Sequence, residues 1–386
     1  MEKEPLIYPS ADESILTSDG ELSATGFITS GTNGGNSTRK KGAKNVFQAF
    51  QSLLKWNKSD DGQLRTSTAF LIMVAMSYGS AVIILPFTLQ QLGPLLWVFF
   101  TIGCFLILTF SAVLLKESCV HIILSRKKDI TRSLIVQRPY PTIAEYAVGK
   151  RFSKIVEATM YVALVAQVLS FALLAATSMN KVIPFLLNTD DRTRIWLLIG
   201  FFITIPFMMV GTYSDLTMPT FIAVFTSFLA STCVLIVSLV AQYSYGVKYS
   251  ADDVDLVKEE HIFKIFGEIL FAATGPALLL PNLIVLLKKP EKFQAPILYS
   301  HFFVFFVYTV LAVVPFLIFG KHVDASILDT LHEVVIKLKM SPVWVSIITL
   351  ASILLAIHFT MVTVLCANPI FLSLENKFNI PTGKYL

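Results

Sequence analysis

Charged residues are scarce in this chain. Only 15% of the 386 residues are Asp, Glu, Lys or Arg, and 54% are hydrophobic, whereas soluble domains carry roughly a quarter charged residues. Together with a mean hydropathy of +0.68, this composition excludes a water-soluble globule, a disordered chain and a coiled coil. The apolar residues, 31 Phe among them, lie in long runs. The sequence therefore predicts a polytopic membrane protein.

Cysteine is also rare. The four cysteines, Cys104, Cys119, Cys233 and Cys366, all lie in or beside apolar segments. None falls in a loop where an oxidising compartment could pair it, and none has metal-ligand spacing to another Cys or His. The sequence also lacks GxSxG, HExxH and a phosphate-binding glycine loop. We therefore expect no disulfide framework, no metal, no cofactor and no enzyme.

The first 62 residues lack a long apolar run and are rich in Ser, Thr and Gly. With so little apolar surface to bury, residues 1–62 are expected to form a disordered cytosolic tail. They contain no apolar core of a signal peptide, so the first membrane helix is expected to direct insertion. Within the tail, residues 2–7 resemble an acidic dileucine sorting signal. This favours a lysosomal, vacuolar or other endomembrane location, with the plasma membrane as the alternative.

Eight apolar segments are long enough to cross the hydrocarbon core, which takes about 20 helical residues. They are residues 67–88, 93–115, 155–183, 195–213, 217–242, 262–287, 297–319 and 343–366. We expect an all-α membrane domain over residues 63–375 and a short cytosolic end at 376–386. Lys and Arg dominate the loops after the second and sixth segments, whereas the loop after the fifth is acidic. Both chain ends are therefore expected in the cytosol.

Two of the expected helices look interrupted. The small residues Ser77–Ala81 lie near the middle of the first and are followed by Pro86, while Ala273–Pro276 lie near the middle of the sixth and are followed by Pro281. Matching interruptions five helices apart are typical of transporters built from inverted repeats, which bind substrate between half-helices at the midplane. Half-helix amino ends suit a carboxylate, and free carbonyls suit a cation or an ammonium group. The alternative is that both are kinks or close-packing sites.

Several short motifs, in this order, resemble the amino acid/auxin permease family. Tyr78–Phe87 resembles the glycine-rich run of its first helix, which ends in Leu-Pro-Tyr or Leu-Pro-Phe, and Pro141–Gly149 resembles its segment before helix 3. Phe271–Pro281 is similar to its helix 6, and Asn368–Glu375 to the end of its helix 8. The similarity extends from about residue 67 to 381.

This resemblance implies a secondary transporter of neutral or cationic amino acids with the inverted-repeat (LeuT-like) architecture known from neurotransmitter:sodium symporters. Relatives have eleven helices, so we expect an incomplete second repeat here, as in a truncated form. Ala81 replaces the second glycine of the family motif. We predict that Gly79, Ser80 and Ala81, with Thr274 and Gly275, cradle the amino and carboxyl groups of the substrate.

Candidates for ion coupling lie in the eighth expected helix. Sodium-coupled relatives carry Asn at the position of Ala75, and a methyl group cannot bind sodium. The sequence therefore favours proton coupling or cation-independent exchange, with sodium as the alternative. His358 is a protonatable candidate at membrane depth, and Thr360 and Thr363 could supply hydroxyls to a cation site. The alternatives are a neutral structural His and hydroxyls bonded to their own helix.

We therefore predict secondary active transport of amino acids, neutral ones in particular, coupled to protons by alternating access around the first and sixth helices. The expected partners are an amino acid and the lipid bilayer, but no nucleic acid. A homo- or hetero-oligomer with a full-length paralogue stays open. Two rival functions also stay open: an amino-acid sensor or scaffold without turnover, and a truncated, nonproductive regulator of that paralogue.

Overall fold

The computed structural model of the protein describes residues 65–125, 138–182, 192–208, 216–247, 262–287 and 289–378. Contacts divide the chain into two units, Met1–Lys58 and Ser59–Leu386, and every described residue belongs to the second. The expected tail at 1–62 and residues 379–386 of the expected cytosolic end at 376–386 therefore lie outside the described residues.

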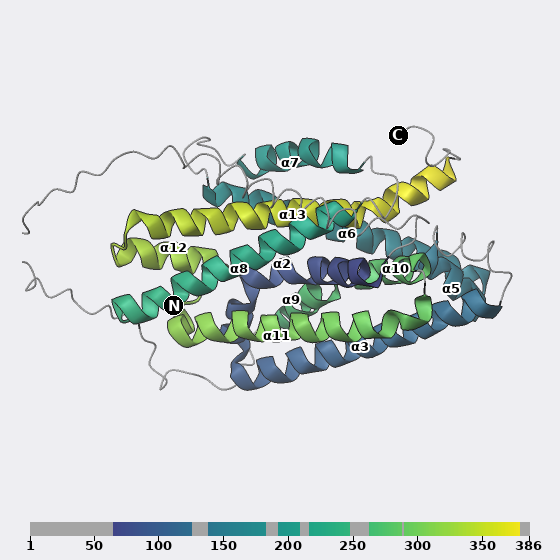
Figure 1. Ribbon diagram of the computed structural model, residues 1–386, viewed down its shortest axis with the longest axis horizontal. Coiled ribbons are helices and arrows are strands. Elements are labelled where there is room, and N and C mark those ends of the chain that lie inside the picture. The colour runs from purple at the N-terminus through teal and green to yellow at the C-terminus, as the bar shows by residue number, and fades with distance from the viewer. Residues whose placement is uncertain are drawn as a thin grey trace, which may run out of the picture. The chain divides into compact units, whose positions relative to one another are not determined.

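The described part of the chain is built of helices, most of them long and packed side by side (Figure 1). In chain order these elements are α2 (Thr66–Leu92), α3 (Pro94–Ser125), α5 (Pro139–Ala147), α6 (Lys150–Val182), α7 (Arg192–Met208), α8 (Thr217–Tyr245), α9 (Ile262–Thr274), η2 (Ala277–Leu279), α10 (Leu280–Leu286), η3 (Pro290–Phe293), α11 (Gln294–Phe319), η4 (Gly320–His322), α12 (Ile327–Lys337) and α13 (Pro342–Lys377). The all-α prediction is confirmed.

Up to seven spans can cross a membrane in the described residues, against eight expected. Five are single helices, and two are bent pairs formed by α2 and by α9 with the η2–α10 segment. The expected span at 195–213 coincides with α7, which has 17 described residues. The structure describes this expected span only as far as Met208.

Two of the helices, α5 and α12, lie outside the predicted spans because they are too short and too polar to cross a bilayer. In α12, Ile327, Leu331 and Val335 are buried at helical spacing, while Glu333 and Lys337 form an ion pair on the opposite side. α5 begins at Pro139. The first N–H groups of a helix have no acceptor within the helix, so proline loses no hydrogen bond at this position. Amphipathic helices of this kind pack against the ends of the spanning bundle.

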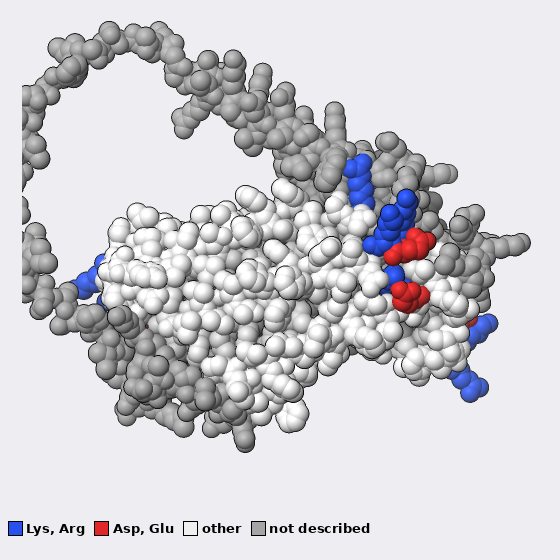
Figure 2. Space-filling model, turned by 60° about the horizontal axis from the view of Figure 1, so that its bottom comes forward, with Lys and Arg blue, Asp and Glu red and all other residues white. Residues whose placement is uncertain are grey.

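Large apolar side chains cover the outside of the long helices. On α3, Phe99, Leu106 and Phe110 are 66–70% exposed, which would be unfavourable in water and is favourable in lipid. Figure 2 shows Lys, Arg and Glu gathered at one end of the described bundle, a few basic residues at the other, and a broad uncharged surface between them. This is the surface of an integral, multi-pass membrane protein.

Both bent spans are buried in the bundle at the bend or the break, although α9 begins with exposed residues such as Phe263. α2 packs against α8, α9 and α11, while α13 packs against α6 and α8. Residues 72–79 of α2 are all buried. Irregular backbone at membrane depth is tolerated where other helices surround it, so this position lets both spans bend.

Candidate functional site

The first expected interruption is a bend. α2 turns by 55° between Thr66–Gly79 and Val82–Leu92, but the chain stays helical from Thr66 to Leu92. The prediction of an interruption is therefore correct in its position, but the helix bends there and does not unwind. Ser80 and Ala81 lie at the bend, and their side chains are outside the described part of the structure.

The second expected interruption is a true break. α9 ends at Thr274, Gly275 and Pro276 form a turn, and the chain continues through η2 into α10 after a change of direction of 42°. The cause is Pro276, because proline has no N–H to offer the carbonyl of the residue four positions earlier. That residue is Ala272, so its carbonyl oxygen loses its helical partner.

The bend and the break meet at glycines. A Cβ atom at Gly275 would lie only 2.1 Å from the carbonyl oxygen of Met76 in α2, so glycine is needed for this backbone approach. A Cβ atom at Gly79 would lie 1.8 Å from Nε2 of His358 in α13. Each irregularity thus presents a glycine to a neighbouring element.

Tyr308 of α11 bridges the bend and the break. Its side chain is fully buried, and its hydroxyl contacts the carbonyl oxygens of Ser77 and Ala272, the second at 2.7 Å. The sequence analysis missed this residue. The missing N–H of Pro276 does predict a carbonyl in need of a donor, but the sequence does not say that a tyrosine on another helix supplies it.

Two buried acceptors beside these glycines have no hydrogen-bond partner among the described residues. Gln167 of α6 donates from Nε2 to the carbonyl of Gly275 at 3.3 Å, and its Oε1 is unpaired. His358 donates from Nδ1 to the carbonyl of Ala223 in α8 at 2.8 Å, which leaves Nε2 as an unpaired acceptor beside Gly79. Unpaired polar atoms are rare inside proteins, and here one lies at the bend and one at the break.

The predicted threonines are bonded within their own helices. Thr274 donates to the carbonyl of Phe271 at 3.4 Å, and Thr360 and Thr363 donate to the carbonyls four residues earlier, each at 2.8 Å. This is the alternative that the sequence left open for the two threonines of α13.

Three phenylalanines are close in sequence to Gln167, Gly275 and His358. Phe171 follows Gln167 by one turn of α6, Phe271 precedes Gly275 by one turn, and Phe359 is next to His358. Their rings are in contact, with centroids 5.9 Å apart for Phe171 and Phe271 and 6.3 Å for Phe171 and Phe359. They form an apolar wall that joins α6, α9 and α13.

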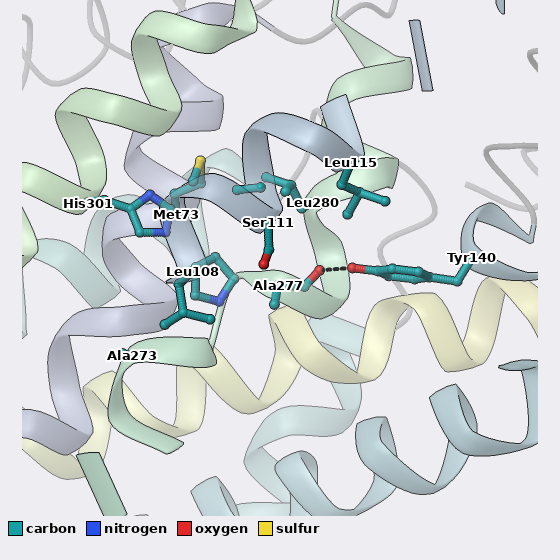
Figure 3. A pocket seen from close by; sticks show the side chains of 11 residues that line it. Met73, Leu108, Ser111, Leu115, Tyr140, Ala273, Ala277, Leu280 and His301 are labelled. Carbon is teal, nitrogen blue, oxygen red and sulfur yellow. Dashed lines mark hydrogen bonds between the residues drawn. The ribbon is translucent and has the colours of Figure 1, made fainter. Parts of the chain in front are cut away.

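A cavity of about 80 Å³ adjoins the break on the side of α3 and α11 (Figure 3). It is lined by Met73, Leu108, Ser111, Ala112, Leu115, Tyr140, Ala273, Pro276, Ala277, Leu280 and His301. At its edge, the Tyr140 hydroxyl donates to the carbonyl of Ala277 at 2.5 Å. Burial raises the pKa of Tyr140, so the phenol keeps its proton and this bond. None of the five predicted substrate-binding residues lines this cavity.

Sequence comparison identifies the class of protein. The sequence model of a family described as transmembrane amino acid transporter protein matches residues 62–384. The chain belongs to this family. The match covers every described residue of this amino acid transporter, including the bend of α2 and the break after α9, and confirms the resemblance seen in the motifs. The protein is therefore a membrane transporter for amino acids and not an enzyme. No curated protein matches the chain.

Proposed function

We propose that this transporter binds one neutral amino acid between the bend of α2 and the break after α9, and carries it across the membrane by alternating access. The observation that supports this most strongly is the direct connection between the two elements. Gly275 lies against the backbone of Met76, and the Tyr308 hydroxyl joins the carbonyls of Ser77 and Ala272. A movement of one bent helix is therefore transmitted to the other.

In this proposal the substrate is held by backbone groups. The carbonyls of Ser77 and Ala272 accept hydrogen bonds from its ammonium group, while the carbonyl of Gly275 keeps its bond to Gln167. The amides of Gly79, Ser80 and Ala81 bind its carboxylate once the bend opens. Thr274 and Gly275 form the opposite side of the cradle. Backbone groups recognise the part of the substrate that all amino acids share.

The preference for a neutral side chain follows from charge. Among the described residues, Lys116 is the only Lys, Arg, Asp or Glu that is buried, and it pairs with Glu117 on α3. A charged substrate side chain in this interior would lack a counter-ion, which is strongly unfavourable. The rings of Phe171, Phe271 and Phe359 instead offer an apolar surface.

Proton coupling through His358 fits the same geometry. Protonation would turn Nε2 from an acceptor into a donor beside Gly79, and a charged imidazole in a dry interior is stabilised by a carboxylate. Substrate and proton would then favour each other's binding. Sodium is less well served, because Ala75 is buried and apolar and the Thr360 and Thr363 hydroxyls already donate within α13.

We further propose that residues 63–375 form the membrane domain. The protein lies in an endomembrane, and both chain ends are on the cytosolic side. Arg65 precedes α2, Lys150 opens α6 and Lys292 precedes α11, and these three helices all begin at the same end of the bundle (Figure 1). α3 also ends here, and in the sequence it is followed by the basic residues Arg126, Lys127 and Lys128. A cytosolic position of this end agrees with the excess of Lys and Arg in short cytosolic loops.

Uptake into proteoliposomes tests this function. The purified full chain is reconstituted and offered labelled amino acids one at a time, with and without an inward proton gradient. We expect uptake of at least one neutral amino acid about tenfold above empty liposomes, with stimulation by the gradient. Binding without uptake would instead support a sensor, and neither binding nor uptake would support a nonproductive regulator. Uptake that follows sodium and ignores pH would contradict the proton assignment.

Gly79→Ala is predicted to disturb the packing of α2 on α13. The added Cβ would lie 1.8 Å from His358 Nε2, and overpacking of this kind destabilises by about 1–3 kcal/mol. We expect a lower unfolding temperature, which the double variant Gly79→Ala/His358→Ala recovers in part because the ring is gone. Gly103→Ala in α3, where a Cβ meets nothing within 4 Å, is the matched control. Failure of the second substitution to rescue the first would contradict this contact.

A further inference from the structure

The hydroxyl of Tyr308 has two acceptors and one proton. Ala272 lacks a helical donor because Pro276 stands four residues later, and the helical partner of Ser77 would be Ala81 at the bend of α2. Both carbonyls converge on the same hydroxyl. A phenol carries a single O–H, so it donates one proton that the two oxygens must share.

This arrangement suits a group with more donors than a hydroxyl has. Incompletely bonded carbonyls are unfavourable in the low-dielectric interior of the protein. A primary ammonium has three N–H donors and a positive charge, so it can give each carbonyl a full, charge-assisted hydrogen bond. The two oxygens are thus better matched to the amino group of an amino acid than to Tyr308.

We propose that the Tyr308 hydroxyl is an internal stand-in for the amino group of the substrate. It occupies the carbonyls of Ser77 and Ala272 in the empty, closed transporter, and an arriving amino acid displaces it. Tyr308 is therefore a positioning residue that holds the α2 bend and the α9 break together between transport cycles. This inference rests on the proposed function, since it assumes that an amino acid binds at the two carbonyls.

The aromatic ring of Tyr308 is held independently of its hydroxyl. It is fully buried on α11, and Phe105 of α3 packs against it edge to face, with 5.6 Å between ring centroids. Phe105 in turn packs against Phe305, one turn before Tyr308 on α11. Tyr308→Phe thus removes the hydrogen bonds while the ring packing is kept.

The inference predicts an unusual pair of effects for Tyr308→Phe. Without substrate, the variant leaves the buried carbonyl of Ala272 without a donor and removes the phenol donor from the carbonyl of Ser77, so it should unfold at a temperature about 3 °C below that of the wild type. With substrate bound, the ammonium group supplies the donors, and no displaced hydroxyl is left unpaired. The variant should therefore bind amino acids about five- to tenfold more tightly than the wild type.

Thermal unfolding of the purified full chain tests this pair of effects. Wild type, Tyr308→Phe and Tyr299→Phe are titrated with an equimolar mixture of the neutral L-amino acids. Tyr299 is on the same helix and is 69% exposed, so its variant controls for the loss of a tyrosine hydroxyl. We expect Tyr299→Phe to match the wild type. We also expect the deficit of Tyr308→Phe to disappear at saturating amino acid, with half-saturation at a lower concentration.

The possible results separate the two proposals. If the wild type responds to the mixture and Tyr308→Phe needs the same or a higher concentration, the stand-in role is overturned while the proposed function survives. A purely structural tyrosine would give this result, with an equal stability deficit at every concentration. If no variant responds to the mixture, both proposals are overturned.

Discussion

Gly275→Ala is expected to abolish amino acid uptake by this transporter. The new Cβ would lie 2.1 Å from the carbonyl oxygen and 2.8 Å from the carbonyl carbon of Met76. Both are backbone atoms, so neither can swing aside and the break must move away from α2 by about 1 Å. Misplacement of binding groups by this distance can reduce a rate about a hundredfold. Initial uptake rates in proteoliposomes, normalised to the amount of protein inserted, measure the effect.

Gly267→Ala is the matched control for this substitution. Gly267 lies in α9, eight residues before Gly275, and a Cβ there meets nothing within 4 Å. Alanine is favoured over glycine inside a helix by about 1 kcal/mol, so this variant should fold and transport like the wild type. Wild-type uptake by Gly275→Ala would contradict the close contact between α2 and the break. Equal losses in both variants would indicate that any side chain in this helix is harmful.

His358→Asn is expected to uncouple transport from the proton gradient. The asparagine amide can still donate to the carbonyl of Ala223, which His358 contacts at 2.8 Å through Nδ1, but it cannot take up a proton. Uptake driven by an inward proton gradient should fall by about tenfold or more. Exchange of labelled for unlabelled amino acid at equal pH on both sides should persist, because it needs binding and movement but no net proton flow.

Two other histidines serve as controls for this experiment. His332 is exposed on α12, and His301 lines the cavity between α3 and α11. We expect both asparagine variants at these positions to keep gradient-driven uptake. If His358→Asn accumulates amino acid normally, His358 is a structural residue, and loss of coupling in His301→Asn would move the proton site to the cavity.

The fold was predictable to the extent that it depends on apolar length. Long apolar runs identify α3, α6, α8, α11 and α13, because only a helix of about 20 such residues satisfies its backbone in lipid. The helices nevertheless extend beyond the runs. α3 continues from the predicted end at 115 to Ser125, and α13 continues from 366 to Lys377. Hydropathy marks where a helix leaves the hydrocarbon, and a helix ends later, where its own hydrogen bonding stops.

The candidate site was predictable at its backbone irregularities and not in its partners. Gly275 and Pro276 predict a break from the sequence alone, because glycine lacks a side chain and proline lacks an N–H. The bend at Ser80 and Ala81 comes just before Val82, whose carbonyl receives no helical hydrogen bond because Pro86 stands four residues later. Tyr308 is different, because its role depends on where α11 packs and no local pattern distinguishes it.

His358 shows the same limit, because its contact with Gly79 cannot be predicted from either residue alone. A histidine at membrane depth is a functional candidate on sequence alone, but its neighbour Gly79 is 279 positions away in the chain. On sequence alone, the missing side chain of glycine indicates only a flexible backbone. Only the packed structure shows that the missing side chain at Gly79 leaves room for the imidazole ring of His358.

Photo-cross-linking with a neutral amino acid that carries a diazirine, such as photo-leucine, locates the substrate most directly. The purified full chain is irradiated with this probe, with and without excess leucine, and the labelled peptides are identified by mass spectrometry. A substrate held between the two bent helices predicts labels, removed by excess leucine, at Ser77–Ala81, at Phe271–Ala277, or at the wall formed by Phe171 and Phe359. Labels that leucine removes but that are confined to other segments, such as Leu108–Leu115 beside the cavity, would contradict it.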